Sequence, residues 1–213
     1  MSHPDQRYGD RTYSQFGEDL ILLNILDKLE IKKCSYFDVG AHHPYNISNT
    51  ALLYERGWRG VCVEANPNHI KAFEYHRPID TILNVGVGVV AGELEFFMID
   101  DFSGRNSFDY DTILEFIKNH PEFKIRTVKQ VKVVTLDSLF DMYGVPDLLC
   151  IDIEGLDYPV LQTMLGRPKV ICVENHGKVE YFDNLLKLLK YDKIFNTIGN
   201  GIYLHESCTG YRN

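Results

Sequence analysis

Short apolar runs alternate along the chain with amphipathic stretches. We interpret the apolar runs as buried strands at 34–39, 60–65, 81–90, 147–155 and 169–175. The amphipathic stretches predict helices at 14–30, 48–57, about 66–76, 136–144 and 178–190, with a further helix that begins at Asp157. Continuously apolar strands that alternate with helices are typical of a mostly parallel sheet with helices on both faces.

The remaining segments modify this picture. Residues 93–99 and 127–135 predict two more strands, the second of them at an edge, and 100–126 has the least regular pattern. Gly199-Asn200-Gly201 lies between two short apolar runs, which predicts a C-terminal antiparallel hairpin. Ser14, Asn66 and Asp157 are the residue types that cap helix starts.

Length and charge narrow the class of protein. The chain has 213 residues, so we expect one domain over 1–213, with an N-terminal helical segment at about 12–31. Its net charge of -8 does not favour nucleic acid or an anionic membrane as a partner, and no apolar run is long enough for a membrane span.

Five cysteines are present, and Cys34, Cys62, Cys150 and Cys172 each lie in a short apolar run. This placement favours buried, reduced thiols over a disulfide framework, so we expect a soluble cytoplasmic protein.

Acidic residues stand at the ends of four predicted strands: Asp38, Glu64, the pair Asp152 and Glu154, and Glu174. Each one alone could cap the next helix or face water. Ligands of parallel sheets bind at the carboxyl ends of the strands, so together these acids mark the expected site.

The first two acids indicate a nucleoside site. Gly40 after the first strand allows a ligand to approach the backbone, and Glu64, at the end of the second strand, is placed to accept both ribose hydroxyls. A dinucleotide site would need further glycines, but Ala41, His42, His43 and Pro44 follow Gly40. The pattern therefore favours S-adenosylmethionine, whose cationic groups Asp38 could face.

The chain resembles the FkbM-type S-adenosylmethionine-dependent methyltransferases. The likeness runs through SQFGEDL (14–20), FDVGAHHPYNISNT (37–50), GWRGVCVEANP (57–67), VTLDSLF (134–140) and IDIEGLDYPVL (151–161). The resemblance implies a seven-stranded, Rossmann-like class I methyltransferase fold and O-methylation of a sugar hydroxyl in polysaccharide or natural-product biosynthesis. Many relatives have glycine where this chain has His43-Pro44, so the acceptor pocket is expected to differ, and 100–126 is expected to be a variable, substrate-facing insertion.

The resemblance also implies residue roles. The expected cofactor-binding residues are Gln15, Asp38, Gly40, Ala41, His42, Asn49, Glu64 and Ala65. Gln15 would approach the methionine end of the cofactor, whereas Asp19 on the same helix could equally be a solvated charge. Of His42 and His43, one could orient a hydroxyl and the other pack the loop.

Deprotonation of the acceptor needs a base or a metal. The candidate catalytic residues are Asp152, Glu154 and His176. Asp152 and the pair Glu174-Asn175 are similar to the magnesium ligands of cation-dependent O-methyltransferases typified by catechol O-methyltransferase, so Mg²⁺ or another divalent cation could bind there.

Two other classes remain open: a nucleotide-cofactor oxidoreductase and a non-catalytic nucleoside-binding domain. The expected partners are a small-molecule or sugar-containing substrate, with a nucleotide-activated sugar as one alternative, and a second copy of the chain in a homo-oligomer.

Overall fold

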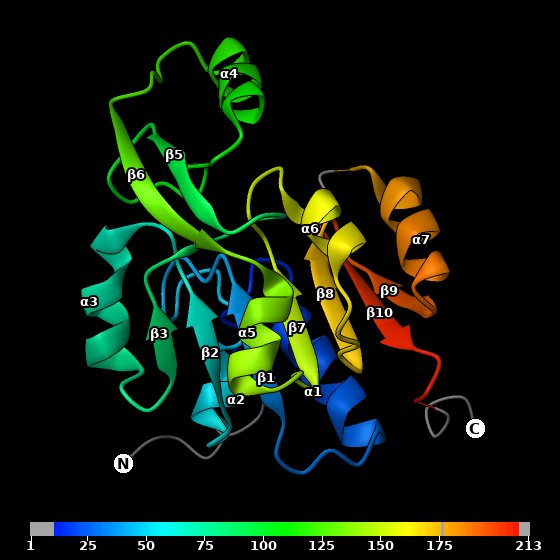
Figure 1. Cartoon of the computed structure of the whole chain (residues 1–213). Helices are drawn as coiled ribbons and strands as arrows, with labels where there is room; N and C mark the ends of the chain where they lie inside the picture. The colour runs from blue at the N-terminus through cyan, green and yellow to red at the C-terminus, as the bar shows by residue number, and fades with distance from the viewer. Residues whose placement is uncertain (1–10, 176, 209–213) are drawn as a thin grey trace.

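A seven-stranded sheet forms the centre of the molecule, which we describe from a computed structural model of residues 11–175 and 177–208. The strand order is β3-β2-β1-β7-β8-β10-β9 (Figure 1). The strands are β1 Ser35–Val39, β2 Arg59–Val63, β3 Thr81–Leu83, β7 Leu148–Ile151, β8 Val170–Glu174, β9 Tyr191–Asn196 and β10 Asn200–His205. The first five in this order pair in parallel, and β10 runs antiparallel to β8 and β9. The predicted sheet and its C-terminal hairpin are confirmed.

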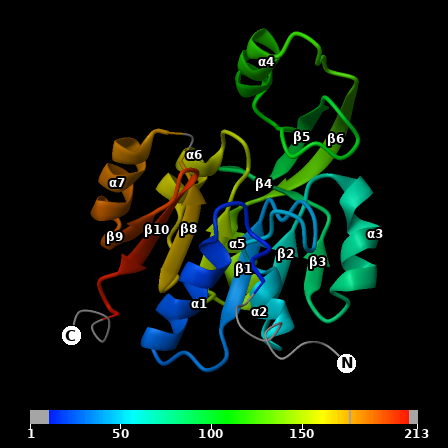
Figure 2. The same cartoon turned by 180° about the vertical axis from the view of Figure 1, so that it is seen from behind.

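Helices cover both faces of this sheet, as the pattern predicted (Figures 1 and 2). One face packs against α1 Glu18–Lys28, α2 Ala51–Glu55 and α3 Pro67–His76. The other packs against α5 Leu136–Tyr143, α6 Asp157–Thr163 and α7 Val179–Leu188. Alternate strand residues face the two layers: Phe37 and Val39 belong to the second, and Tyr36 belongs to the first.

A smaller sheet projects beyond the carboxyl ends of the main strands (Figure 1). It contains β4 Gly86–Val87, β6 Thr127–Val134 and β5 Gly92–Met98 in that order, and α4 Tyr110–Asn119 lies beside it. Two predictions are corrected here. The expected strand at 81–90 divides into β3 and β4, which join different sheets, and β6 is the central strand of its sheet and not an edge.

Two predicted helix caps are wrong. Helix α1 begins after Gly17, and Ser14 instead donates a 2.9 Å hydrogen bond to the carboxylate of Asp19. Asp157 is the first residue of α6, and its carboxylate accepts the backbone N–H groups of Ile153 and Gly155 from the preceding turn. In both cases the polar side chain stabilises the turn before the helix.

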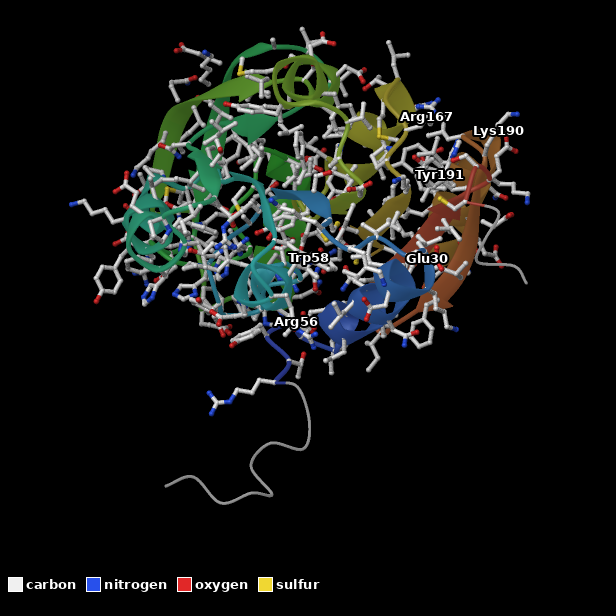
Figure 3. All side chains as sticks on the ribbon, turned by 90° about the horizontal axis from the view of Figure 1, so that it is seen from below. Glu30, Arg56, Trp58, Arg167, Lys190 and Tyr191 are labelled. Carbon is white, nitrogen blue, oxygen red and sulfur yellow. The ribbon has the colours of Figure 1, made fainter. Side chains whose placement is uncertain are left out.

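The cysteine prediction is confirmed. Cys34, Cys62, Cys150 and Cys172 are buried free thiols, and Cys208 is partly exposed. Trp58 is 8% exposed and packs in the layer with α1 to α3. It lies near the amino-terminal ends of the main strands, the side that faces the viewer in Figure 3. No helix in the described ranges is long and apolar enough to cross a membrane.

Gly40 is the tightest point at the end of the sheet. Its φ is +80°, and a Cβ added there would lie 1.7 Å from the backbone oxygen of Asp152, which follows β7. The loop after β1 therefore passes directly over the end of β7, and a side chain at this position would push the two apart.

We predict that Gly40→Ala lowers the free energy of unfolding by more than about 3 kcal/mol, because backbone strain and overpacking add. Gly57→Ala is the matched control: its φ is +83°, but nothing lies within 4 Å of an added Cβ. The control should lose only about 1 kcal/mol in urea unfolding. Equal losses in both variants would show that the approach of Asp152 does not constrain Gly40.

Candidate functional site

Two adjoining pockets open at the carboxyl ends of the main strands. The first lies between the ends of β1, β2 and β7 and the small sheet and has about 490 Å³ of empty space, part of it open to solvent. The second lies beside Gln15, Ile47 and Glu174 and has about 720 Å³ of empty space, also partly open to solvent. The pockets share a wall formed by Gly40, His42, Gly104, Asp152 and Glu154.

Glu64 lines the first pocket and is held by backbone N–H groups. His42 donates to its Oε2 and Asn66 to its Oε1, both at 2.7 Å. The residue is 7% exposed, and burial raises the pKa of its carboxyl to about 7 despite these two bonds. The carboxylate is thus fixed in position at the end of β2, where the sequence predicted a ribose acceptor.

The two histidines after Gly40 have separate roles. His42 lines both pockets with a positive φ of 51°, and its Nε2 lies 3.0 Å from the carbonyl oxygen of Phe102. His43 turns away from them, and its Nδ1 accepts the backbone N–H groups of Tyr45 and Asn46 at 3.1 and 3.0 Å. His43 is therefore the residue that shapes the loop, and His42 is the one at the site.

The small sheet completes the first pocket with apolar side chains. Val87, Phe96 and Phe108 line it together with Val85, which precedes β4. These residues were not among the predicted site residues, because their segments were predicted as strands that continue or flank the main sheet. The alternation of Leu94, Phe96 and Met98 was the signal for a one-sided apolar face.

Three carboxylates meet at the ends of β7 and β8. One oxygen each of Asp152, Glu154 and Glu174 lies within 4.8 Å of the others. Asp152 and Glu174 share a hydrogen bond, and Asp152 Oδ1 is buried without a hydrogen-bond partner among the described residues. We call these three residues the acid cluster.

Burial and mutual repulsion raise the proton affinity of the acid cluster. Burial is the largest cause for each member; it raises the pKa of Glu154 to about 8 and that of Glu174 to about 7, and the pKa of Asp152 lies well above its usual range. Arg105 opposes this effect, because its Nη1 donates to both carboxylate oxygens of Glu154 at 3.1 and 3.0 Å. Arg105 comes from the loop before α4 and was missed, since nothing in an irregular stretch indicates a partner 49 residues away.

The SQFGED stretch positions Gln15 at the second pocket. Asp19 is fully buried, not a solvated charge: it accepts bonds from the Thr12 hydroxyl and the Tyr13 N–H, both at 2.7 Å. Glu18 accepts bonds from Thr197 and Asn200, which ties the start of α1 to the C-terminal hairpin.

The structure separates several predicted residues from the pockets. Asp38 faces away, accepts a hydrogen bond from Thr50, and has a pKa raised by burial. Ala41 packs in the core, and Asn49 lines neither of the two pockets. Ala65, by contrast, lines the first pocket as predicted for a cofactor contact. The proposed cofactor contacts of Asp38, Ala41 and Asn49 therefore gain no support.

The side chain of Asn175, the third predicted metal ligand, has hydrogen-bond partners at the turn after β8. Asn175 is fully buried, its amide donates to Asn196 at 3.2 Å, and its Oδ1 accepts the N–H of Gly177 at 3.1 Å. It fixes the turn after β8 and is not a member of the acid cluster. His176, the predicted base, lies outside the described residues.

We predict that Asp152→Asn stabilises the protein at high pH. A raised pKa means that the folded state binds more protons than the unfolded chain, so stability falls as pH rises from the unfolded to the folded pKa. Removing the charge should raise the free energy of unfolding by about 1 kcal/mol or more near pH 8, and by less at pH 5, in urea titrations. Asp141→Asn, at an exposed position on α5, is the control. A loss of stability at both pH values would contradict a repulsive acid cluster.

Comparison with known proteins identifies the family. The family model described as the methyltransferase FkbM domain matches residues 38–195. No curated protein matches the chain. The matched region begins at the end of β1 and extends into β9, so it includes Glu64, the acid cluster and every strand end that lines the pockets. The chain therefore belongs to the FkbM methyltransferase family.

Proposed function

We propose that the protein transfers a methyl group from S-adenosylmethionine to a hydroxyl of a sugar or glycan precursor. The observation that carries the proposal is the pair of adjoining pockets: the fixed Glu64 carboxylate lines the first, and Asp152 and Glu154 of the acid cluster lie in the wall that the two pockets share. Methyltransferases of this family use S-adenosylmethionine in general, and the arrangement provides separate places for donor and acceptor.

The backbone of the loop after β1, which we call the glycine loop (residues 40–42), favours S-adenosylmethionine over a dinucleotide as the ligand. A pyrophosphate is bound by free N–H groups of such a loop. Here Gly40 and Ala41 both donate to the carbonyl of Val63, at 2.9 and 3.1 Å, and His42 donates to Glu64. The nucleoside, by contrast, would find Glu64 for its ribose and the apolar side chains of the small sheet for its base.

The acid cluster suits a neutral polyol acceptor. Carboxylates accept hydrogen bonds from hydroxyl groups, and a proton acceptor works best when its pKa is close to the working pH. In the proposed step the acceptor oxygen attacks the methyl carbon, the carbon–sulfur bond breaks, and the hydroxyl proton passes to a carboxylate. The products are a methyl ether and S-adenosylhomocysteine. We propose that 100–126 faces the acceptor, since its Arg105 reaches the acid cluster.

A divalent cation is the second candidate for activating the hydroxyl. Asp152, Glu154 and Glu174 offer the hard oxygen ligands that Mg²⁺ prefers, and the buried Asp152 Oδ1 lacks a partner among the described residues. A bound cation would lower the pKa of a coordinated hydroxyl. It would have to displace Arg105 from Glu154, so we favour the carboxylates acting without a metal.

We predict that S-adenosylhomocysteine binds more tightly as pH rises from about 6 to about 8. Below its pKa of about 7, Glu64 is protonated and loses its capacity to accept from both ribose hydroxyls. Glu64→Gln should weaken binding by about 1–3 kcal/mol above neutrality and remove this pH dependence. Isothermal titration calorimetry measures both.

Glu74→Gln, at an exposed position on α3, is the matched control and should leave affinity unchanged. Wild-type binding of NAD instead of S-adenosylhomocysteine would reject the proposed donor. Unchanged affinity in Glu64→Gln would remove Glu64 from the donor site.

We predict that methylation of a hydroxyl acceptor survives in EDTA and falls at least about a hundredfold in Asp152→Asn, the usual contribution of a proton acceptor. Initial rates with a radiolabelled donor and a panel of sugars measure this. Loss of activity in EDTA and its recovery with Mg²⁺ would establish the cation instead. Full activity in Asp152→Asn with a large loss in His176→Ala would assign the base to His176.

A further inference from the structure

A short loop covers the first pocket and has firmly fixed ends. Residues 101–105 connect Asp100 to Asn106, whose Nδ2 donates to the Asp100 carbonyl at 2.8 Å and whose Oδ1 accepts the Ile99 N–H at 2.9 Å. Ser107 then pairs with Phe97 of β5 through two backbone hydrogen bonds. Because both ends are tied to the small sheet, any movement of the loop is confined to its five central residues.

One side of this loop is held by three contacts from the donor side of the site. The carbonyl of Asp101 accepts bonds from Asn66 and Asn68, at 2.8 and 2.9 Å. The carbonyl of Phe102 lies 3.0 Å from the ring of His42. Since the acceptors are backbone atoms, these contacts fix the first half of the loop against α3 and the glycine loop.

The other side of the loop is held by one ion pair. Ser103 and Gly104 line the first pocket, and Gly104 and Arg105 line the second, so this half lies at the boundary of the two. Within the described part of the chain, the bifurcated contact of Arg105 Nη1 with the two carboxylate oxygens of Glu154 is the only side-chain hydrogen bonding that joins residues 103–105 to the end of β7. The side chain of Arg105 is 46% exposed and that of Glu154 is 12% exposed, so water can reach the pair.

We propose that Arg105 is a positioning residue that latches the 101–105 loop over the donor pocket through Glu154. Release of this ion pair opens the boundary between the pockets, which allows the donor to exchange and frees the Glu154 carboxylate for the acceptor. The inference rests on the proposed function, because it takes the first pocket as the donor site.

The asymmetry of the contacts determines how the loop opens. Three hydrogen bonds hold the half next to α3, whereas a single, partly solvated ion pair holds the half next to β7. Such a pair is weak enough to break often. An acceptor hydroxyl that binds Glu154 competes with Arg105 for the same oxygens, so acceptor binding and loop opening are linked.

The test compares Arg105→Ala, Arg105→Lys and the control Arg126→Ala. Arg126 is a fair control because it pairs with Asp100 at the base of the same loop, at 3.9 Å, and is 62% exposed. Surface plasmon resonance gives the association and dissociation rates of S-adenosylhomocysteine. Hydrogen exchange of the amides of 101–105, without ligand, reports loop opening directly.

Arg105→Ala should raise both rates about two- to fivefold, as expected for loss of a partly exposed ion pair, with a smaller change in affinity. It should also speed exchange in the loop. Arg105→Lys should restore part of the wild-type behaviour, and Arg126→Ala should match the wild type. Glu154→Gln should behave like Arg105→Ala, and the double variant should add little, because both changes break one contact.

Two failures can be told apart. If the wild type does not bind S-adenosylhomocysteine, the proposed donor is rejected, and loop exchange in Arg105→Ala still tests the latch. If the wild type binds and Arg105→Ala leaves the rates and the exchange unchanged, the latch is rejected and the proposed function stands.

Discussion

The close approach of the Gly40 backbone to the Asp152 carbonyl is the constraint on which the site depends. It brings together the ends of β1 and β7, the two strands from which the sheet extends in opposite directions along the strand order. Crevices of parallel sheets form where the order reverses in this way. Because the loop after β1 lies directly on β7, the fixed Glu64 carboxylate and the acid cluster face two pockets with one shared wall.

Buried acids at the strand ends are accommodated in three different ways. Glu64 is held by backbone N–H groups, which orient it without neutralising it. Asp38 lies in the layer with α1 to α3, near the buried guanidinium of Arg77. The acid cluster has Arg105 as its counterion and keeps raised pKa values, which is the condition expected of groups that take up a proton near neutral pH. A cost of burial therefore remains where we propose that chemistry occurs.

The sequence could predict the parts of the fold that rest on local pattern. The apolar strands, the helices between them and the hairpin at Gly199 follow from burial periodicity and turn chemistry. The division between β3 and β4 could not be predicted, because a two-residue strand has no period and its partner is 47 residues away (Gly86 and Val133). The orientation of Asp38 and the partner of Arg105 could not be predicted from the sequence either, since each depends on which elements pack together. Glu64 and the acid cluster could be located because a strand end is a position that sequence alone defines.

The turn after Glu154 connects α4, beside the small sheet, to the acid cluster at the end of the main sheet. Gly155 has a φ of +108°, and a Cβ there would lie 2.7 Å from the Thr112 hydroxyl and 3.0 Å from a carboxylate oxygen of Asp109. The start of α4 thus rests on the peptide that follows Glu154, whereas the far end of α4 projects away from the main sheet (Figure 1). We therefore expect uneven tolerance to sequence change in α4: its distal end should vary in length and composition freely, whereas its first turn should change only together with the turn that follows Glu154.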